Sequence, residues 1–243
     1  MSYQTVARTD VGRVRDVNED AVYASATDEW GLLVVADGMG GHTAGDVASE
    51  AAIEAFRDVV EPELADGYPG ESEALFRNAA IEANDELRQM IDEDRSLEGM
   101  GTTLVAALLA ADEATLVNVG DSRGYHVTEG AIQQVTVDHS LVQQLVDEGE
   151  ITPEEARDHP QRNVVSQALG TQDSVDPDTV TVALDGWIML CSDGLTEEVP
   201  DHAIQTIVAD AADPSAAAEA LVARANENGG SDNVSVAIGH RSS

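Results

Sequence analysis

Three aspartates lie beside apolar segments of this 243-residue chain, each followed by a glycine or an asparagine. An isolated Asp-Gly pair is usually a turn. Carboxylates brought together at strand ends repel one another unless a cation joins them, and ligand sets made only of oxygen select hard ions such as Mg²⁺ or Mn²⁺. The repetition therefore favours a divalent metal site over three unrelated turns. The pairs are Asp37-Gly38, Asp193-Gly194 and Asp232-Asn233.

An arginine stands among acids near the start of the sequence, in the segment RDVNED (15–20). Two interpretations of Arg15 are open from the residues alone. It could form a surface ion pair with a neighbouring acid. Alternatively, its guanidinium fork could bind phosphate oxygens in a bidentate manner.

The elements that must position these residues follow from the apolar pattern. Short apolar runs predict strands at 32–35, 102–109, 115–119, 125–127, 131–135, 187–191 and 234–238. Helical spacing predicts helices at 47–59, 72–91, 141–146, 203–209 and 216–225, and TPEE at 152–155 is a capping box. Long helices between groups of short strands favour a sheet-on-sheet core with helices outside over a doubly wound parallel sheet.

The chain resembles the metal-dependent serine/threonine phosphatases of the protein phosphatase 2C family, in their compact bacterial and archaeal form. One Asp-Gly pair would be weak, whereas an ordered set of segments covering nearly the whole chain is highly specific. The matching segments, in family order, are RDVNED (15–20), VADGMGGH (35–42), EGMGTT (98–103), VGDSRGY (119–125), TPEEA (152–156), HPQR (159–162), LCSDGL (190–195) and SDNVS (231–235).

The resemblance implies an α+β fold, a four-layer αββα sandwich in which helices flank two antiparallel β-sheets. It implies a single phosphatase domain over residues 1–243 with a variable flap at about 139–170. It also implies two Mn²⁺ or Mg²⁺ ions in a core site, with Asp37 as the bridging ligand, and a third ion between Asp121 and Asp193. The implied ligands are Glu19, Asp37, Gly38, Asp121, Asp193 and Asp232.

The implied reaction is hydrolysis of phosphoserine and phosphothreonine by direct attack of a metal-bridging hydroxide. Arg15 would bind the substrate phosphate and Asp20 would orient the water. Animal members carry a histidine directly after the Asp-Gly pair, where this chain has Met39. His42 is then a candidate general acid, although it could equally be a helix-start residue without a catalytic part.

Two asparagines, Asn18 and Asn233, are expected to bond neighbouring backbone and hold the acidic segments in shape.

Other functions fit less well. A cysteine phosphatase needs an arginine six positions after its nucleophile, and Cys191 is followed there by Glu197. An aspartyl-phosphate enzyme needs an apolar strand before its D-x-D-x-V motif, and the segment 176–180 lacks one, which predicts a turn. A catalytically weak homologue acting as a regulatory binding module remains the alternative, but all the implied metal ligands are present.

The charge balance limits the partners. With 12 Lys+Arg and 47 Asp+Glu the net charge is −35, so binding to nucleic acid or membrane surfaces through a basic patch is excluded. The acid excess fits a surface adapted to high salt, or a nucleic-acid mimic. One cysteine and no signal or membrane segment predict a soluble, cytoplasmic protein. The family resemblance implies phosphoprotein partners, namely a Ser/Thr kinase or its substrates.

The acid excess predicts that salt stabilises the fold. At about 0.01 M salt the Debye length is about 30 Å, so most pairs of acids repel, whereas at ~1 M it is about 3 Å. We therefore expect the thermal midpoint to rise steeply between 0.05 and 2 M KCl, measured with a chelator present. A flat or falling midpoint would refute the adaptation to salt and favour the nucleic-acid mimic.

Overall fold

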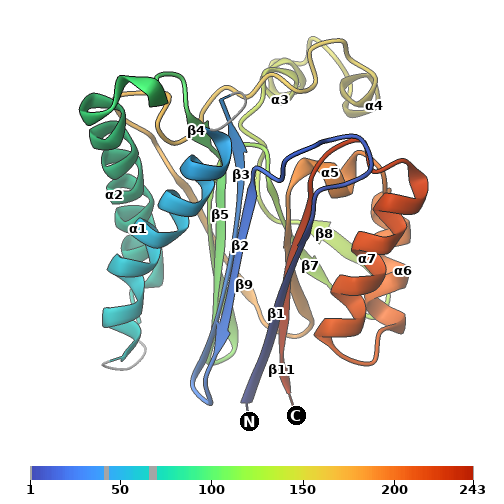
Figure 1. The fold of residues 1–243 in the computed structure, drawn as a ribbon. Coiled ribbons are helices and arrows are strands. Elements are labelled where there is room, and N and C mark those ends of the chain that lie inside the picture. Colours follow the sequence, from blue (N-terminus) through green and yellow to red (C-terminus); the bar gives the residue numbers. More distant parts are fainter. Residues whose placement is uncertain (1, 41–43, 66–69, 243) are drawn as a thin grey trace.

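Two antiparallel sheets packed face to face form the centre of the computed structural model, which describes residues 2–40, 44–65 and 70–242 (Figure 1). The β5 sheet has the order β2 (Asp20–Ala26), β3 (Trp30–Met39), β5 (Leu104–Ala110), β6 (Glu113–Val119), β9 (Asp178–Ala183), with β4 (Gly101–Thr102) paired to β3. The β10 sheet has the order β1 (Ser2–Asp10), β11 (Val234–Ser242), β10 (Trp187–Cys191), β7 (Arg123–Val127), β8 (Ile132–Gln134).

Helices cover the outer face of each sheet, so the architecture is the expected α+β sandwich of four layers (Figure 1). The helices on the β5 sheet are α1 (Gly45–Ala65) and α2 (Ser72–Glu93), and a 3₁₀ helix (Arg95–Leu97) follows them. Those on the β10 sheet are α5 (Asp193–Thr196), α6 (Asp201–Asp210) and α7 (Pro214–Asn228). Two short helices, α3 (Leu141–Asp147) and α4 (Pro153–Arg157), stand above one end of the sandwich (Figure 1).

The central strands are apolar on both faces because both faces are covered. In β3, Leu33 and Val35 pack between the sheets, while Leu32, Val34 and Ala36 pack towards α1 and α2. A strand buried on both sides reads as a continuous apolar run, which is the pattern that the sequence shows at 32–35.

Small side chains stand among large ones in the middle layer. Ala107 of β5 and Ala237 of β11 are fully buried there, beside larger residues such as Ile188. On the outer side, Phe56 of α1 meets Phe76 of α2 edge to face, with ring centroids 5.1 Å apart. The outer and middle layers together make two helix-to-sheet cores and one sheet-to-sheet core.

Most predicted elements are present, and the capping box of α4 is formed by Thr152 and Glu155. The strands β1, β2 and β9 were not predicted. The turn predicted at 176–180 is wrong in part, because β9 begins at Asp178 and pairs with β6. The segment opens a strand and does not follow one, which agrees with the rejection of an aspartyl-phosphate nucleophile.

None of the helices within the described residues combines the length and the apolar character that a membrane crossing requires.

Candidate active site

Five aspartates from both sheets meet at one end of the sandwich, below α3 and α4 and opposite the two chain ends (Figure 1). Asp37 lies near the end of β3, and Asp193 opens α5 directly after β10. Asp20 begins β2, while Asp121 follows β6 and Asp232 precedes β11. The charges of the other four all act on the Asp37 carboxyl. Residues more than 200 positions apart therefore form one acidic cluster.

Burial and mutual repulsion make these carboxyls hard to ionise. Burial, followed by the charges of its four neighbours, raises the pKa of Asp37 well above its usual range. Burial and the Asp121 charge raise the pKa of Asp193 to about 8, and burial raises the pKa of Asp20 and of Asp121 to about 6. Cations near the cluster would offset this repulsion, so the residues fit a divalent metal site.

The expected metal ligands do not surround a single point in this structure. Among the described residues, no three Asp, Glu, His or Cys side chains are as close together as in a formed metal cluster. One expected ligand, Asp232, and the neighbouring Asp20 are each bound to another side chain. Arg15 Nη2 lies 2.6 Å from Asp232 Oδ2, and Ser192 Oγ donates to Asp20 Oδ2 at 2.8 Å. The all-oxygen donor set and the mutual repulsion still match a hard divalent ion.

Asn233 ties the segment before β2 to the start of β11. Its Oδ1 accepts from the Glu19 backbone N–H at 2.8 Å, and its Nδ2 donates to the carbonyls of Val11 and Val17. Asn18 accepts from the Asp20 N–H at 3.3 Å. The expected role of the two asparagines in holding the acidic segments is confirmed.

Close backbone packing explains the glycine after Asp37. Asp37-Gly38 is not a turn, because β3 continues to Met39 and Gly38 pairs with Thr102 of β4. A Cβ on Gly38 would collide with the Gly45 carbonyl, and a Cβ on Gly45 would touch the Glu19 carboxylate. The glycines therefore let Glu19 approach the Gly38 backbone, as the expected second metal site requires.

The second Asp-Gly pair is also not a simple turn. Asp193 and Gly194 begin α5, and a Cβ on Gly194 would collide with the Asn233 carbonyl. Here too the glycine permits a close approach between two segments that are far apart in sequence. This contact brings Asp193 beside the Asp232 segment.

A pair of threonines that the sequence analysis gave no role fixes Asp37. The Asp37 N–H donates to Thr103 Oγ1 at 3.0 Å, and Thr102 Oγ1 donates to the Asp37 carbonyl at 2.9 Å. Thr103 is held in turn by Ser122 at 2.8 Å. The available signal was the matching segment EGMGTT (98–103), in which both threonines stand.

Asp121 lies beside a half-buried ion pair. Arg123 donates to both Asp138 oxygens, at 2.7 to 3.1 Å. The Asp138 charge contributes to the raised pKa of Asp121, and the Arg123 charge opposes it. The pair was not predicted to belong to the site.

The remaining candidates are Arg15, Cys191 and His42, and the structure bears on each in a different way. The Arg15 side chain is 48% exposed and bound to Asp232, so the ion pair considered for it is present. Burial raises the pKa of the Cys191 thiol to about 12, which leaves no thiolate for a cysteine phosphatase. His42 lies outside the described residues.

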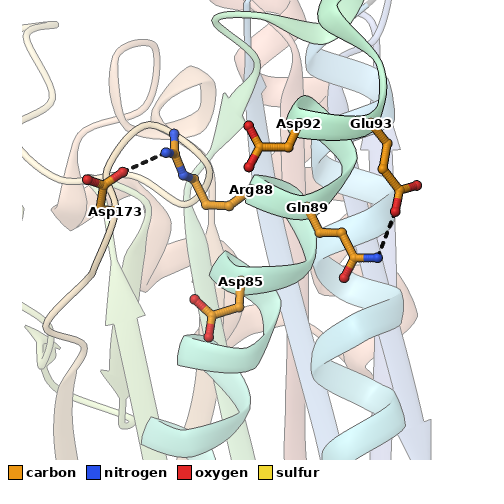
Figure 2. A pocket seen from close by; sticks show the side chains of 6 residues that line it. All are labelled: Asp85, Arg88, Gln89, Asp92, Glu93 and Asp173. Carbon is orange, nitrogen blue, oxygen red and sulfur yellow. Dashed lines mark hydrogen bonds and ion pairs between the residues drawn. The ribbon is translucent and has the colours of Figure 1, made fainter.

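The acids along α2 lack this convergence. Figure 2 shows a hollow along α2 where Asp85, Asp92 and Glu93 project from the helix and Arg88 pairs with Asp173 at 2.5 Å. All four of these acids are exposed. This hollow is a solvated acidic face.

Comparisons with known proteins agree on one family. A family model described as protein phosphatase 2C matches residues 12–227. The serine/threonine phosphatase Stp of Listeria monocytogenes is 41% identical over 238 residues, which are 96% of this chain and 94% of that protein. The phosphatase PstP of Mycobacterium tuberculosis is 45% identical over 237 residues, which are 96% of this chain and 44% of that longer protein.

Solved structures match over the whole fold. The crystal structure of Mycobacterium tuberculosis PstP/Ppp has a TM-score of 0.90 at 40% identity and covers all of both chains. A structure of the PstP catalytic domain in complex with two manganese ions has a TM-score of 0.86 at 38% identity, over 98% of both chains.

The Asn233 contacts predict a stability effect. Asn233→Ala should lower the free energy of unfolding by about 1–3 kcal/mol, because part-buried backbone groups of Val11, Val17 and Glu19 lose their partner. It should also speed amide hydrogen exchange in residues 11–20. Urea unfolding and exchange measurements check this, with the exposed Asn163→Ala as control. Equal unfolding curves for the two variants would contradict it.

Proposed function

The chain belongs to the protein phosphatase 2C family and is a metal-dependent serine/threonine phosphatase, and we propose that the acidic cluster is where it hydrolyses phosphoserine and phosphothreonine. The observation that carries this proposal is the convergence of five aspartates from both sheets on one solvent-reached site. A cluster of that charge has little value in a purely structural role, because its repulsion opposes folding. The regulatory binding module is not supported.

The proposed metal ligands follow the placement of the oxygens. Asp37 lies among the other carboxylates and would be shared by two ions, with Asp193 and Asp232 on one of them. Glu19 and the Gly38 carbonyl would serve the other. Divalent ions at such a site activate water for attack on phosphorus and offset charge on the phosphoryl oxygens.

Asp121, with Asp193, would hold a third ion. The closeness of the two carboxyls supports this assignment, because the Asp121 charge acts directly on the Asp193 carboxyl. The Arg123–Asp138 pair fixes the backbone beside Asp121.

Asp20 and Arg15 would act on the reactants. Ser192 donates to Asp20 Oδ2 at 2.8 Å, which helps to fix the direction of the carboxylate that would accept a proton from the attacking water. Arg15 is exposed at the edge of the cluster, where its guanidinium can exchange the Asp232 oxygen for a phosphate oxygen.

The substrates, the cellular location and the adaptation to salt are also part of the proposal. The names of the relatives support phosphoserine and phosphothreonine proteins as substrates, and a Ser/Thr kinase that makes them is the proposed partner. The single, buried and unpaired cysteine supports a reducing, cytoplasmic location. The net charge of −35 supports adaptation to high salt and opposes nucleic-acid binding.

The proposed function is tested by comparing a phosphothreonine peptide with a matched phosphotyrosine peptide in molar KCl, with Mn²⁺ or with chelator. We expect release of phosphate from the phosphothreonine peptide only when Mn²⁺ is present. Equal hydrolysis in chelator, or preference for phosphotyrosine, would overturn the proposal.

Asp37→Asn should lower kcat at least ~10³-fold and weaken Mn²⁺ binding in calorimetry. Folding should survive. The raised pKa of Asp37 means that its ionised form costs stability at neutral pH, so in chelator the variant should melt no lower than the native chain. Asp92→Asn, at an exposed position of α2, is the control. Unchanged activity and Mn²⁺ affinity would rule out Asp37 as a ligand.

Arg15→Ala should mainly raise KM, because a phosphate contact present in both the bound substrate and the transition state affects binding more than turnover. A bidentate charge-assisted contact is worth roughly 2–3 kcal/mol, or about 30- to 150-fold in kcat/KM. Steady-state kinetics on a phosphothreonine peptide measure this, with Arg13→Ala as the neighbouring control. If kcat/KM were unaffected, Arg15 would be only the ion partner of Asp232.

A further inference from the structure

The helices α3 and α4 expose apolar side chains that a short amphipathic helix normally buries. No residue of either helix is buried, although α3 has the sequence LVQQLVD. Val142 and Val146 lie on one side of α3, four positions apart, and each is only half-buried. An apolar side without a covering element in a fixed helix is available to a ligand.

These side chains line a cavity of about 800 Å³ between α3, α4 and α5. Val142, Val146, Pro153 and Ala156 form its apolar part. Asp121 and Asp193 line the same cavity. The space is therefore continuous with the acidic cluster, and it is within reach of the residues that adjoin a phosphorylated residue bound at the cluster.

The cavity walls are held in place. Ser140 caps α3 by accepting from the Gln143 N–H, and Thr152 and Glu155 cap α4. Arg162, which follows α4 in the chain, pairs with Glu197, which directly follows α5, and Arg162 Nε lies 3.5 Å from Glu197 Oε1. Such a site is largely formed before a ligand binds, which lowers the entropy cost of binding.

The net negative charge of the cavity favours a substrate that has a basic residue near its phosphorylated residue. Arg123 and Arg162 are matched by Asp138 and Glu197. Asp158 and Asp201 also line the cavity, and no ion pair of either is found within the described part of the chain. Asp201 Oδ1 accepts from the Tyr125 hydroxyl at 3.4 Å, which leaves its charge in place. Arg157 also lines the cavity, and the chain as a whole is strongly acidic.

We propose that this cavity is the subsite for the residues that flank the phosphorylated one in a phosphoprotein substrate, and that it selects an aliphatic side chain followed by a basic residue. The aliphatic side chain packs on Val142, Val146 and Ala156, and the basic residue faces Asp158 and Asp201. The inference rests on the proposed function, because it needs the phosphorylated residue at the acidic cluster.

The test uses four phosphothreonine peptides and p-nitrophenyl phosphate, each with Mn²⁺, at the lowest KCl concentration that keeps the chain folded. The peptides carry leucine or serine on both sides of the phosphothreonine, combined with arginine or glutamate at the next position outward. We expect kcat/KM to be about 10-fold or more higher for the leucine–arginine peptide than for the serine–glutamate peptide.

Variants of residues that line the cavity test whether the peptide preference arises there. Val146→Asp should lower kcat/KM for the leucine peptides about 10-fold, to the level of the serine peptides, and leave p-nitrophenyl phosphate hydrolysis unchanged. Ala156→Leu fills the same space without adding charge and should act in the same direction. Asp158→Arg should abolish the preference for arginine over glutamate. Ile81→Asp, an equivalent change at an exposed position of α2, should alter none of these rates.

The outcomes separate the two proposals. Equal rates for all four peptides, or an unchanged leucine preference in both Val146→Asp and Ala156→Leu, would overturn the subsite while p-nitrophenyl phosphate hydrolysis upholds the phosphatase. Failure to hydrolyse p-nitrophenyl phosphate with Mn²⁺ would overturn the proposed function and the subsite with it.

Discussion

Repulsion among five carboxyls is the constraint around which this fold is arranged. The carboxyls share one end of the sandwich, and burial together with their mutual charge raises the pKa of Asp37 and Asp193 far above that of a free aspartate. The chain holds them there through bonds to neutral groups, such as Thr103 and Asn233, that add no further charge. The packing of the two sheets must therefore offset the unfavourable repulsion among the carboxyls.

Prediction from the sequence was most accurate for elements that depend mainly on residues adjacent in the chain. The strand 187–191 was predicted residue for residue, because its apolar run has Gly186 before it and Ser192 after it. The edge strands β1 and β2 were missed because their exposed faces mix polar and apolar residues without a clean alternation. The strand β9 is also at an edge and was taken in part for a turn.

The five aspartates of the cluster were predictable from the sequence, but the residues that hold them and their arrangement were not. The ordered motifs identified the carboxylates. They could not reveal that Gly38 serves close packing against Gly45, or that Thr103 holds the Asp37 backbone across 66 positions, because both are tertiary contacts. Arg15 shows the same limit, since residue types alone left an ion pair and a phosphate role equally open and did not indicate Asp232 as the ion partner.

The small side chains of the middle layer have a consequence for how such a site can diverge. Asp37 belongs to one sheet, while Asp193 and Asp232 adjoin the other, so the distance between the sheets sets the distance between these carboxylates. Ala107 and Ala237 lie in that gap. A larger residue at either position would push the sheets apart, so the separation of these carboxylates could change through substitutions that touch none of them. Substitutions between the sheets can thus change the geometry of the site during evolution.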